Sequence, residues 1–196
     1  MKRYLVPFLC YVLIPLILNP FLDQVITYTI RTAIVAGLLI YFYKRYNLKF
    51  RFSLLSLLVG VLLFLIWLVL ASIFPIGLSI YEPITMYAII IKVLGLVLVA
   101  PFIEELFVRD FLIRFAQGGE KWESIKIGKF CWPSFVISVL FFGFSHSLWL
   151  AGLVTGVGFN LLLYKTKRID AIIQAHMIVN FILTIYVLYT GQWMLW

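Results

Sequence analysis

Residues 54–74 read LLSLLVGVLLFLIWLVLASIF, a run of apolar side chains without a single charge. A helix needs roughly 20 apolar residues to cross the hydrocarbon core of a bilayer, so this run predicts a transmembrane helix. The whole chain has the same character, because 64% of its 196 residues are hydrophobic and only 12% are charged. A soluble domain has about half apolar and about a quarter charged residues, so a bilayer rather than water is expected to surround this chain.

Apolar runs on both sides of this segment predict seven transmembrane helices. The expected spans are residues 4–22, 25–43, 54–74, 84–115, 132–148, 151–164 and 171–188. Short runs separate them, most of which contain Lys, Arg, Pro or Gly, and no internal repeat is visible. We therefore expect a single membrane domain over residues 1–196, whose fold is an all-α, polytopic integral membrane helix bundle.

The basic residues are concentrated in alternate loops. With seven crossings, four basic segments fall on one side of the membrane: residues 2–3, 44–51, 117–129 and 165–168. The opposite loops contain Asp23 and Glu82 but no Lys or Arg. The positive-inside rule therefore places the N-terminus in the cytoplasm and the C-terminus outside. The net charge of +8 is thus explained by topology, which indicates membrane lipids as partners and no nucleic acid.

Three polar clusters interrupt the apolar spans. They read EELFVR at residues 104–109, FGFSH at residues 142–146 and HMIVN at residues 176–180. Ionisable side chains inside a span are costly, and they usually face the interior of the bundle or a water-filled cavity. Phe142 lies four residues before His146 and can pack under its imidazole. Pro101 cannot donate to the carbonyl of Val97, so we expect a kink that admits water beside the first cluster.

The spacing within the clusters determines which side chains share a helix face. Glu105 and Arg109 are four residues apart, so they can form an ion pair that acts as a strut. Glu104 points about 100° away from Glu105 and faces a different neighbour. His176 and Asn180 are also four residues apart, which aims a ring and an amide in the same direction. The two acids are therefore expected to have different roles.

Side chains of these types can together catalyse the hydrolysis of an amide bond without a covalent nucleophile. A carboxylate in a poorly solvated pocket can take a proton from water and later return it, and a facing histidine can orient that water. A second histidine and an asparagine amide can donate hydrogen bonds to the oxygen that becomes negative when a carbonyl is attacked. We therefore expect Glu104 and His146 to act on water, and His176 and Asn180 to stabilise the oxyanion.

The ordered set Glu-Glu-x-x-x-Arg, Phe-x-x-x-His and His-x-x-x-Asn resembles the CAAX protease and bacteriocin-processing (CPBP) family, over residues 97–181. The resemblance implies a glutamate-type intramembrane protease, a class formerly described as metallo-type. Its substrate would be a membrane-associated protein or peptide, with lipid-modified proteins included. The resemblance carries catalytic roles to Glu104, His146, His176 and Asn180, and supporting roles to Glu105, Arg109 and Phe142.

This mechanism needs no cofactor. Glutamate and histidine are nevertheless also zinc ligands, so a zinc ion bound by Glu104, His146 and His176 is the alternative. The arrangement of His176 and Asn180 fits an oxyanion site better than a metal site.

A finer resemblance is carried by three stretches, which are EELFVR at residues 104–109, HSLWLAG at residues 146–152 and YTGQW at residues 189–193. They look like the exosortase-associated CAAX prenyl protease-like branch, which is bacterial. This resemblance implies a multi-pass protein of the bacterial inner (cytoplasmic) membrane. We expect its site to open within the membrane toward the cytoplasm.

Two alternatives to proteolysis remain. The first is a non-catalytic immunity or scaffold protein of the same family, in which the polar clusters are structural. The second is a small transporter with a proton relay, although transporters usually contain repeats that this chain lacks. At ~1.5 Å per residue, Glu104 lies roughly 18 Å from the basic end of its span at Ala116, whereas His176 lies roughly 9 Å from Asp170. Catalysis requires these motifs to converge nonetheless.

Overall fold

The computed structural model describes residues 1–74 and 85–195, and this part of the chain is helical without a strand. Its seven helices are α1 (Lys2–Leu18), α2 (Gln24–Tyr46), α3 (Leu54–Ile73), a continuous helix over Met86–Ser124, α7 (Trp132–Phe144), α8 (Trp149–Thr166) and α9 (Ile169–Thr190). Each expected span falls on one of these helices, although some bounds differ, so the all-α membrane bundle is confirmed. Glu82 and the expected start of the fourth span at Ile84 lie outside the described residues.

The helix over Met86–Ser124 changes its winding along its length. It consists of α4 (Met86–Leu94), the π-helical η1 (Gly95–Val99), α5 (Ala100–Glu105), the π-helical η2 (Leu106–Leu112), α6 (Ile113–Gly118) and the 3₁₀-helical η3 (Gly119–Ser124). Turns of π-helix are rare in proteins and occur frequently at functional sites. Here they flank the short helix α5, which carries the two adjacent acids.

Four of the described helices are long and apolar enough to cross a membrane: α2, α3, the helix over Met86–Ser124 and α9. By contrast, α7 has only 13 residues, or about 20 Å at about 1.5 Å per residue, which is less than the ~30 Å hydrocarbon core. The expected span over residues 132–148 is therefore wrong at its end. The helix stops at Phe144, and His146 lies in the turn before α8.

The chain can turn back inside the bundle because α7 and α8 approach each other closely. A Cβ atom added to Gly152 would lie 3.0 Å from the Cα atom of Gly143, and one added to Gly143 would lie 2.3 Å from a methyl group of Leu153. Glycine at both positions lets the two helices meet right beside the turn. The turn also keeps its backbone paired, since the His146 amide donates to the carbonyl of Gly143 at 3.2 Å.

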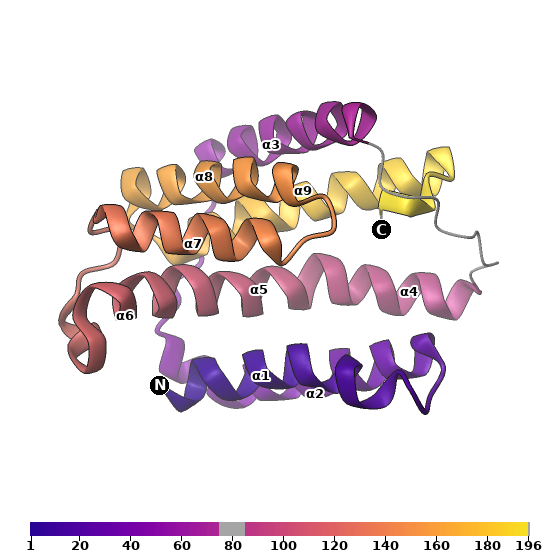
Figure 1. Cartoon of the computed structure of the whole chain (residues 1–196), viewed down its shortest axis with the longest axis horizontal. Helices are drawn as coiled ribbons and strands as arrows, with labels where there is room; N and C mark the ends of the chain where they lie inside the picture. The colour runs from indigo at the N-terminus through magenta and orange to yellow at the C-terminus, as the bar shows by residue number, and fades with distance from the viewer. Residues whose placement is uncertain (75–84, 196) are drawn as a thin grey trace.

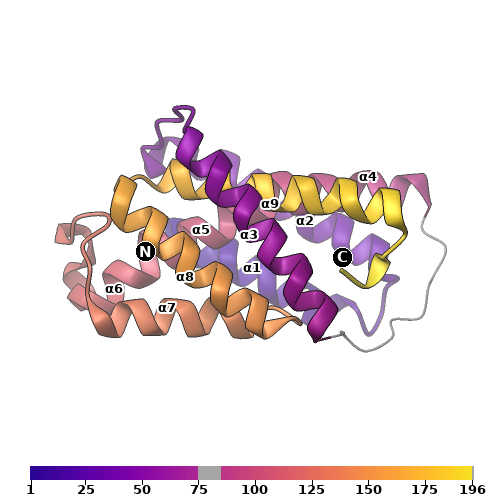
Figure 2. The same cartoon turned by 90° about the horizontal axis from the view of Figure 1, so that it is seen from above.

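The helices form layers around the long central helix. Figure 1 shows α1 and α2 on one side of the helix over Met86–Ser124, with α7, α8, α9 and α3 on the other side. Seen from above, α3 crosses α8 and α9 and packs against both (Figure 2). The two termini lie at opposite ends of the bundle (Figure 1), as an odd number of crossings requires.

The four basic segments meet at the end of the bundle that contains the N-terminus. Arg3 forms an ion pair with Glu123 of η3 at 3.3 Å. The backbone amide of Arg51 donates to Asp170 at the start of α9 at 3.1 Å. Chain segments that are far apart in the sequence therefore gather into one basic end, as the alternation of charged loops predicts. Which compartment this end faces stays a prediction.

Candidate active site

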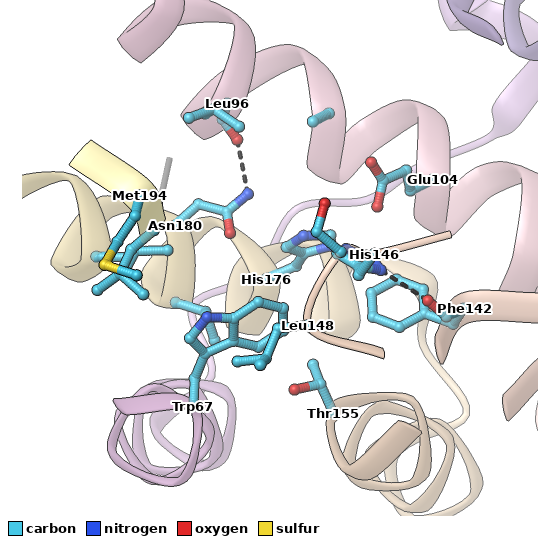
Figure 3. Close-up of a pocket in the computed structure, with 15 residues that line it drawn as sticks. Trp67, Leu96, Glu104, Phe142, His146, Leu148, Thr155, His176, Asn180 and Met194 are labelled. Atoms are coloured by element: carbon cyan, nitrogen blue, oxygen red, sulfur yellow. Dashed lines mark hydrogen bonds between the residues drawn. The ribbon is translucent and has the colours of Figure 1, made fainter. Parts of the chain in front are cut away.

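A cavity of about 200 Å³ lies among α3, α5, α7, α8 and α9. Its wall contains all four of the side chains that were expected to be catalytic: Glu104, His146, His176 and Asn180. Figure 3 shows them around this one space, with Trp67, Leu148 and Thr155 on the opposite wall. The three clusters thus converge, and the apparent difference in depth between Glu104 and His176 does not keep them apart.

Glu104 projects from α5 into the cavity. One of its carboxylate oxygens, Oε1, accepts a hydrogen bond of 3.0 Å from the Tyr11 hydroxyl of α1. The other oxygen, Oε2, is buried and has no hydrogen-bond partner among the described residues. The first interaction holds the carboxylate in place, and the second oxygen is left able to accept a proton or a hydrogen bond from water.

Tyr11 is a site residue that sequence reasoning missed. Its ring lies under the guanidinium of Arg31, 4.7 Å from the ring centroid, and Arg31 also stacks on Tyr28 at 4.4 Å. A cation over an aromatic face is attracted to it electrostatically, so Arg31 helps to hold the Tyr11 ring in place. A single tyrosine in an apolar span gives no distinctive sequence signal, so only the packing of α1 against α5 brings it to the site.

His146 is held by the end of α7. Its Nδ1 lies 2.7 Å from the backbone carbonyl of Phe142, and its ring packs on the Phe142 ring with 4.6 Å between centroids. The expected packing of these two residues is therefore confirmed, although His146 lies in a turn rather than in the helix. A carbonyl can only accept, so Nδ1 carries the hydrogen, and in the neutral ring Nε2 is the acceptor.

His176 is oriented by Glu105 rather than by water. Its Nδ1 lies 2.8 Å from Glu105 Oε1, so the carboxylate accepts from Nδ1. The expected pair between Glu105 and Arg109 also forms, with 3.2 Å between Oε2 and a guanidinium nitrogen. Both members of this pair are fully buried. Glu105 therefore joins the central helix to α9, which is a connection the i, i+4 spacing alone does not indicate.

The face of Arg109 is covered by aromatic rings. Its guanidinium lies 4.2 Å from the centroid of Phe142 and 5.5 Å from that of Phe159. Phe142 therefore packs between the buried cation and His146, and it supports both. This contact explains why a phenylalanine at this position belongs with the polar clusters.

Asn180 donates through Nδ2 to the backbone carbonyl of Leu96 at 2.8 Å (Figure 3). That carbonyl is free because the amide of Ala100 bonds to Gly95 instead, and because Pro101 has no amide hydrogen to offer. Pro101 thus helps to free the Leu96 carbonyl, which the Asn180 side chain uses, and the admission of water beside Glu104 stays a prediction. The second hydrogen of the amide remains for another acceptor.

The residues proposed as zinc ligands do not make a metal site in this arrangement. Among the described residues, no group of three His, Cys, Asp or Glu side chains is placed to hold one metal ion. Glu104 is bound to Tyr11, and the two histidines reach the cavity from different elements. The donor set therefore does not fit zinc here, and the chemistry below uses no metal.

The cavity lies toward the end of the bundle that carries the C-terminus. Its wall there includes Leu183 of α9 and two residues of the short turn η4 (Trp193–Leu195), Met194 and Leu195. None of the described Lys or Arg residues lines it. The hairpin of α7 and α8 thus places His146 nearer the end opposite the basic segments, and the expected opening toward the cytoplasm stays a prediction.

Comparison with known families agrees with this geometry. The model of the family described as type II CAAX prenyl endopeptidase Rce1-like matches residues 85–182, which is half of the chain and contains all three polar clusters. The chain belongs to this family. The Rce1-like family is a family of intramembrane proteases, so this Rce1-like chain is a multi-pass membrane protein of the protease class. No curated protein and no solved structure matches it.

Two features of this Rce1-like protein lie outside the matched segment. Tyr11, which bonds to Glu104, belongs to α1, and Trp67, whose ring lies 5.7 Å from that of His146, belongs to α3. The N-terminal helices therefore add Trp67 to the cavity wall and Tyr11 as the donor to Glu104, whereas the four expected catalytic side chains all come from the matched half.

Proposed function

We propose that this protein is an intramembrane endopeptidase that hydrolyses a peptide bond of a membrane-associated protein, with lipid-modified proteins as the substrate class. The observation that carries the proposal is the convergence of Glu104, His146, His176 and Asn180 on one cavity. The family to which the chain belongs is described as a prenyl endopeptidase family, which supports the substrate class. Residues from separate helices would not need to share a wall if each were only a packing residue.

The first step is attack by water on the scissile carbonyl. Glu104 accepts one proton of the water through Oε2, which has no other described partner, while Nε2 of His146 accepts a hydrogen bond from the other hydrogen. The oxygen–carbon bond forms as the proton moves to the carboxylate. The hydrogen bond from Tyr11 to Oε1 keeps the carboxylate directed into the cavity during this transfer.

The second step is collapse of the tetrahedral intermediate. Its oxyanion accepts the second amide hydrogen of Asn180 and Nε2–H of His176, which is available when the ring is protonated. Glu105 accepts from Nδ1 of that ring, and the ion pair with Arg109 holds Glu105 in place. Glu104 then returns its proton to the leaving nitrogen as the carbon–nitrogen bond breaks and the oxyanion reforms the carbonyl, giving a carboxylic acid and an amine.

The membrane setting follows from the charged loops. In a bacterial inner membrane, with the basic end in the cytoplasm, the cavity lies in the outer half of the bilayer. The sequence features that resemble the exosortase-associated branch are compatible with this placement, and membership of that branch stays a prediction.

A quenched fluorogenic peptide that carries a farnesylated Cys-a-a-X ending tests the function. We expect the purified protein to cleave it, and Glu104→Gln to lose on the order of 100-fold or more in kcat while the protein still folds. His146→Ala is expected to behave similarly. If the wild type binds the peptide without cleaving it, the non-catalytic immunity or scaffold alternative is correct instead.

A further inference from the structure

A second cavity, of about 340 Å³, lies at the basic end of the bundle, away from the candidate active site. Its basic wall comes from two connections: Lys49 and Arg51 lie between α2 and α3, and Lys167 and Arg168 lie between α8 and α9. Asp110 and Asp170 also line it. None of these residues takes part in the chemistry proposed above.

Both acids in this wall are already neutralised. Asp110 forms an ion pair of 2.5 Å with Arg114 and accepts a hydrogen bond from Tyr4. Asp170 pairs with Arg168. Among the described residues, no carboxylate lies within ion-pair distance of the remaining three bases, which are Lys49, Arg51 and Lys167. The cavity therefore has an excess of positive charge.

The backbone that carries these bases is held in a fixed position. The amide of Arg51 donates to Asp170 at 3.1 Å, and its carbonyl accepts from Gln174 at 2.8 Å and from Arg168 at 2.7 Å. Lys167 has a left-handed backbone, with φ 54°. A Cβ atom on Gly128, which lies beside it, would come within 3.0 Å of the Lys167 side chain. The site is therefore built before any ligand binds.

The connection over residues 48–53 also has two chemically different faces. Lys49 and Arg51 line the cavity, whereas the alternate residues Phe50 and Phe52 do not. Side chains alternate in this way along an extended chain. Phe52 is 80% exposed and Phe50 is 44% exposed, with its other side against Phe102. Exposed aromatic rings beside basic side chains, at the ends of transmembrane helices, are typical of the membrane interface.

We propose that this cavity, lined by Lys49, Arg51 and Lys167, binds the phosphate group of an anionic lipid headgroup. Three unpaired cations converge where the helices end, which is the depth of lipid phosphates, and the adjacent rings can lie against the acyl chains. Because α9 begins in this wall and carries His176 and Asn180, a bound phosphate also fixes the end of the helix that supplies the oxyanion donors. The same basic side chains would also bind free inorganic phosphate, so the experiment must distinguish a lipid phosphate from free phosphate.

Native mass spectrometry of the full chain in detergent, titrated with phosphatidylglycerol and with phosphatidylcholine of the same chain length, tests the proposal. Lys49→Gln/Lys167→Gln is expected to bind phosphatidylglycerol on the order of 10- to 30-fold more weakly than the wild type. The matched control is Lys121→Gln/Lys126→Gln, which removes the same charge from residues of the basic end outside the cavity. The control is expected to keep the affinity of the wild type.

A competition arm identifies the source of the phosphate. If inorganic phosphate in large excess does not displace phosphatidylglycerol, the lipid is the ligand and the proposal is supported. Displacement by inorganic phosphate at low concentration would overturn the lipid assignment. Equal weakening in the two double variants would show that diffuse surface charge binds the lipid, and it would overturn the site. Equal affinity for both lipids would show that the anionic headgroup is not recognised, and it would overturn the proposal. Arg51→Gln repeats the test at a residue whose hydrogen bonds are made by its backbone, so the substitution leaves them in place.

Discussion

Replacing each of the two adjacent acids by glutamine should separate stability from chemistry. Glu105 and Arg109 are both fully buried and 3.2 Å apart. Removing one member of a buried ion pair leaves an uncompensated charge and costs about 3–5 kcal/mol. The substituted glutamine would keep an oxygen that can accept from His176, so the expected loss for Glu105→Gln is at the lower end, about 3 kcal/mol. In a chain of this length, that loss lowers Tm by about 6–12 °C.

Glu104→Gln is the matched control, with the same substitution one residue earlier. Glu104 has no cation within ion-pair distance among the described residues, and its one hydrogen bond comes from Tyr11. A glutamine oxygen can accept that hydrogen bond, so the free energy of unfolding should change by less than about 1 kcal/mol. The corresponding shift in Tm is within about 2–4 °C.

The assay is thermal unfolding in one detergent, followed by tryptophan fluorescence, with peptide cleavage measured on the same samples. The expected pattern is a low Tm for Glu105→Gln with partial activity, and a normal Tm for Glu104→Gln with activity lost. Equal shifts in Tm for the two variants would refute the division of roles between the acids. A normal Tm for Glu105→Gln would show that the buried pair is not a strut.

Other substitutions test the remaining parts of the site. Asn180→Ala should lower kcat by about 100- to 1,000-fold if Asn180 donates to the oxyanion, whereas a change in Tm alone would assign it to packing. Tyr11→Phe removes the hydroxyl that holds Glu104, and it should lower kcat on the order of 10-fold with KM unchanged; an unchanged kcat would remove Tyr11 from the site. A strong zinc chelator should leave cleavage intact, and loss of activity that zinc restores would establish the metal alternative. In a cysteine-free background, Met194→Cys should be inhibited by a bulky, water-soluble thiol reagent because Met194 lines the cavity, and the exposed control Tyr189→Cys, outside the cavity, should not be.

The sequence by itself determined which segments form helices and which polar clusters interrupt them. Runs of apolar residues identified all seven helices, because a helix in a bilayer needs apolar side chains whatever its neighbours are, although only four of the described helices are long and apolar enough to cross. The i, i+4 spacing within a helix likewise predicted the contacts of Glu105 with Arg109 and of Phe142 with His146, since both contacts are local. Such features depend on hydropathy and helix geometry, which the sequence contains directly.

Tertiary structure decided where those residues meet. The early end of α7 depends on the close approach of Gly143 to α8, and the π-helical turn η1 redirects a backbone carbonyl to Asn180. The bonds from Tyr11 to Glu104 and from His176 to Glu105 join segments far apart in the chain. No local pattern specifies such contacts, because they depend on how helices of similar apolar character pack against one another. The meeting of the four polar side chains could therefore be expected from the sequence, whereas the contacts that hold them there could not.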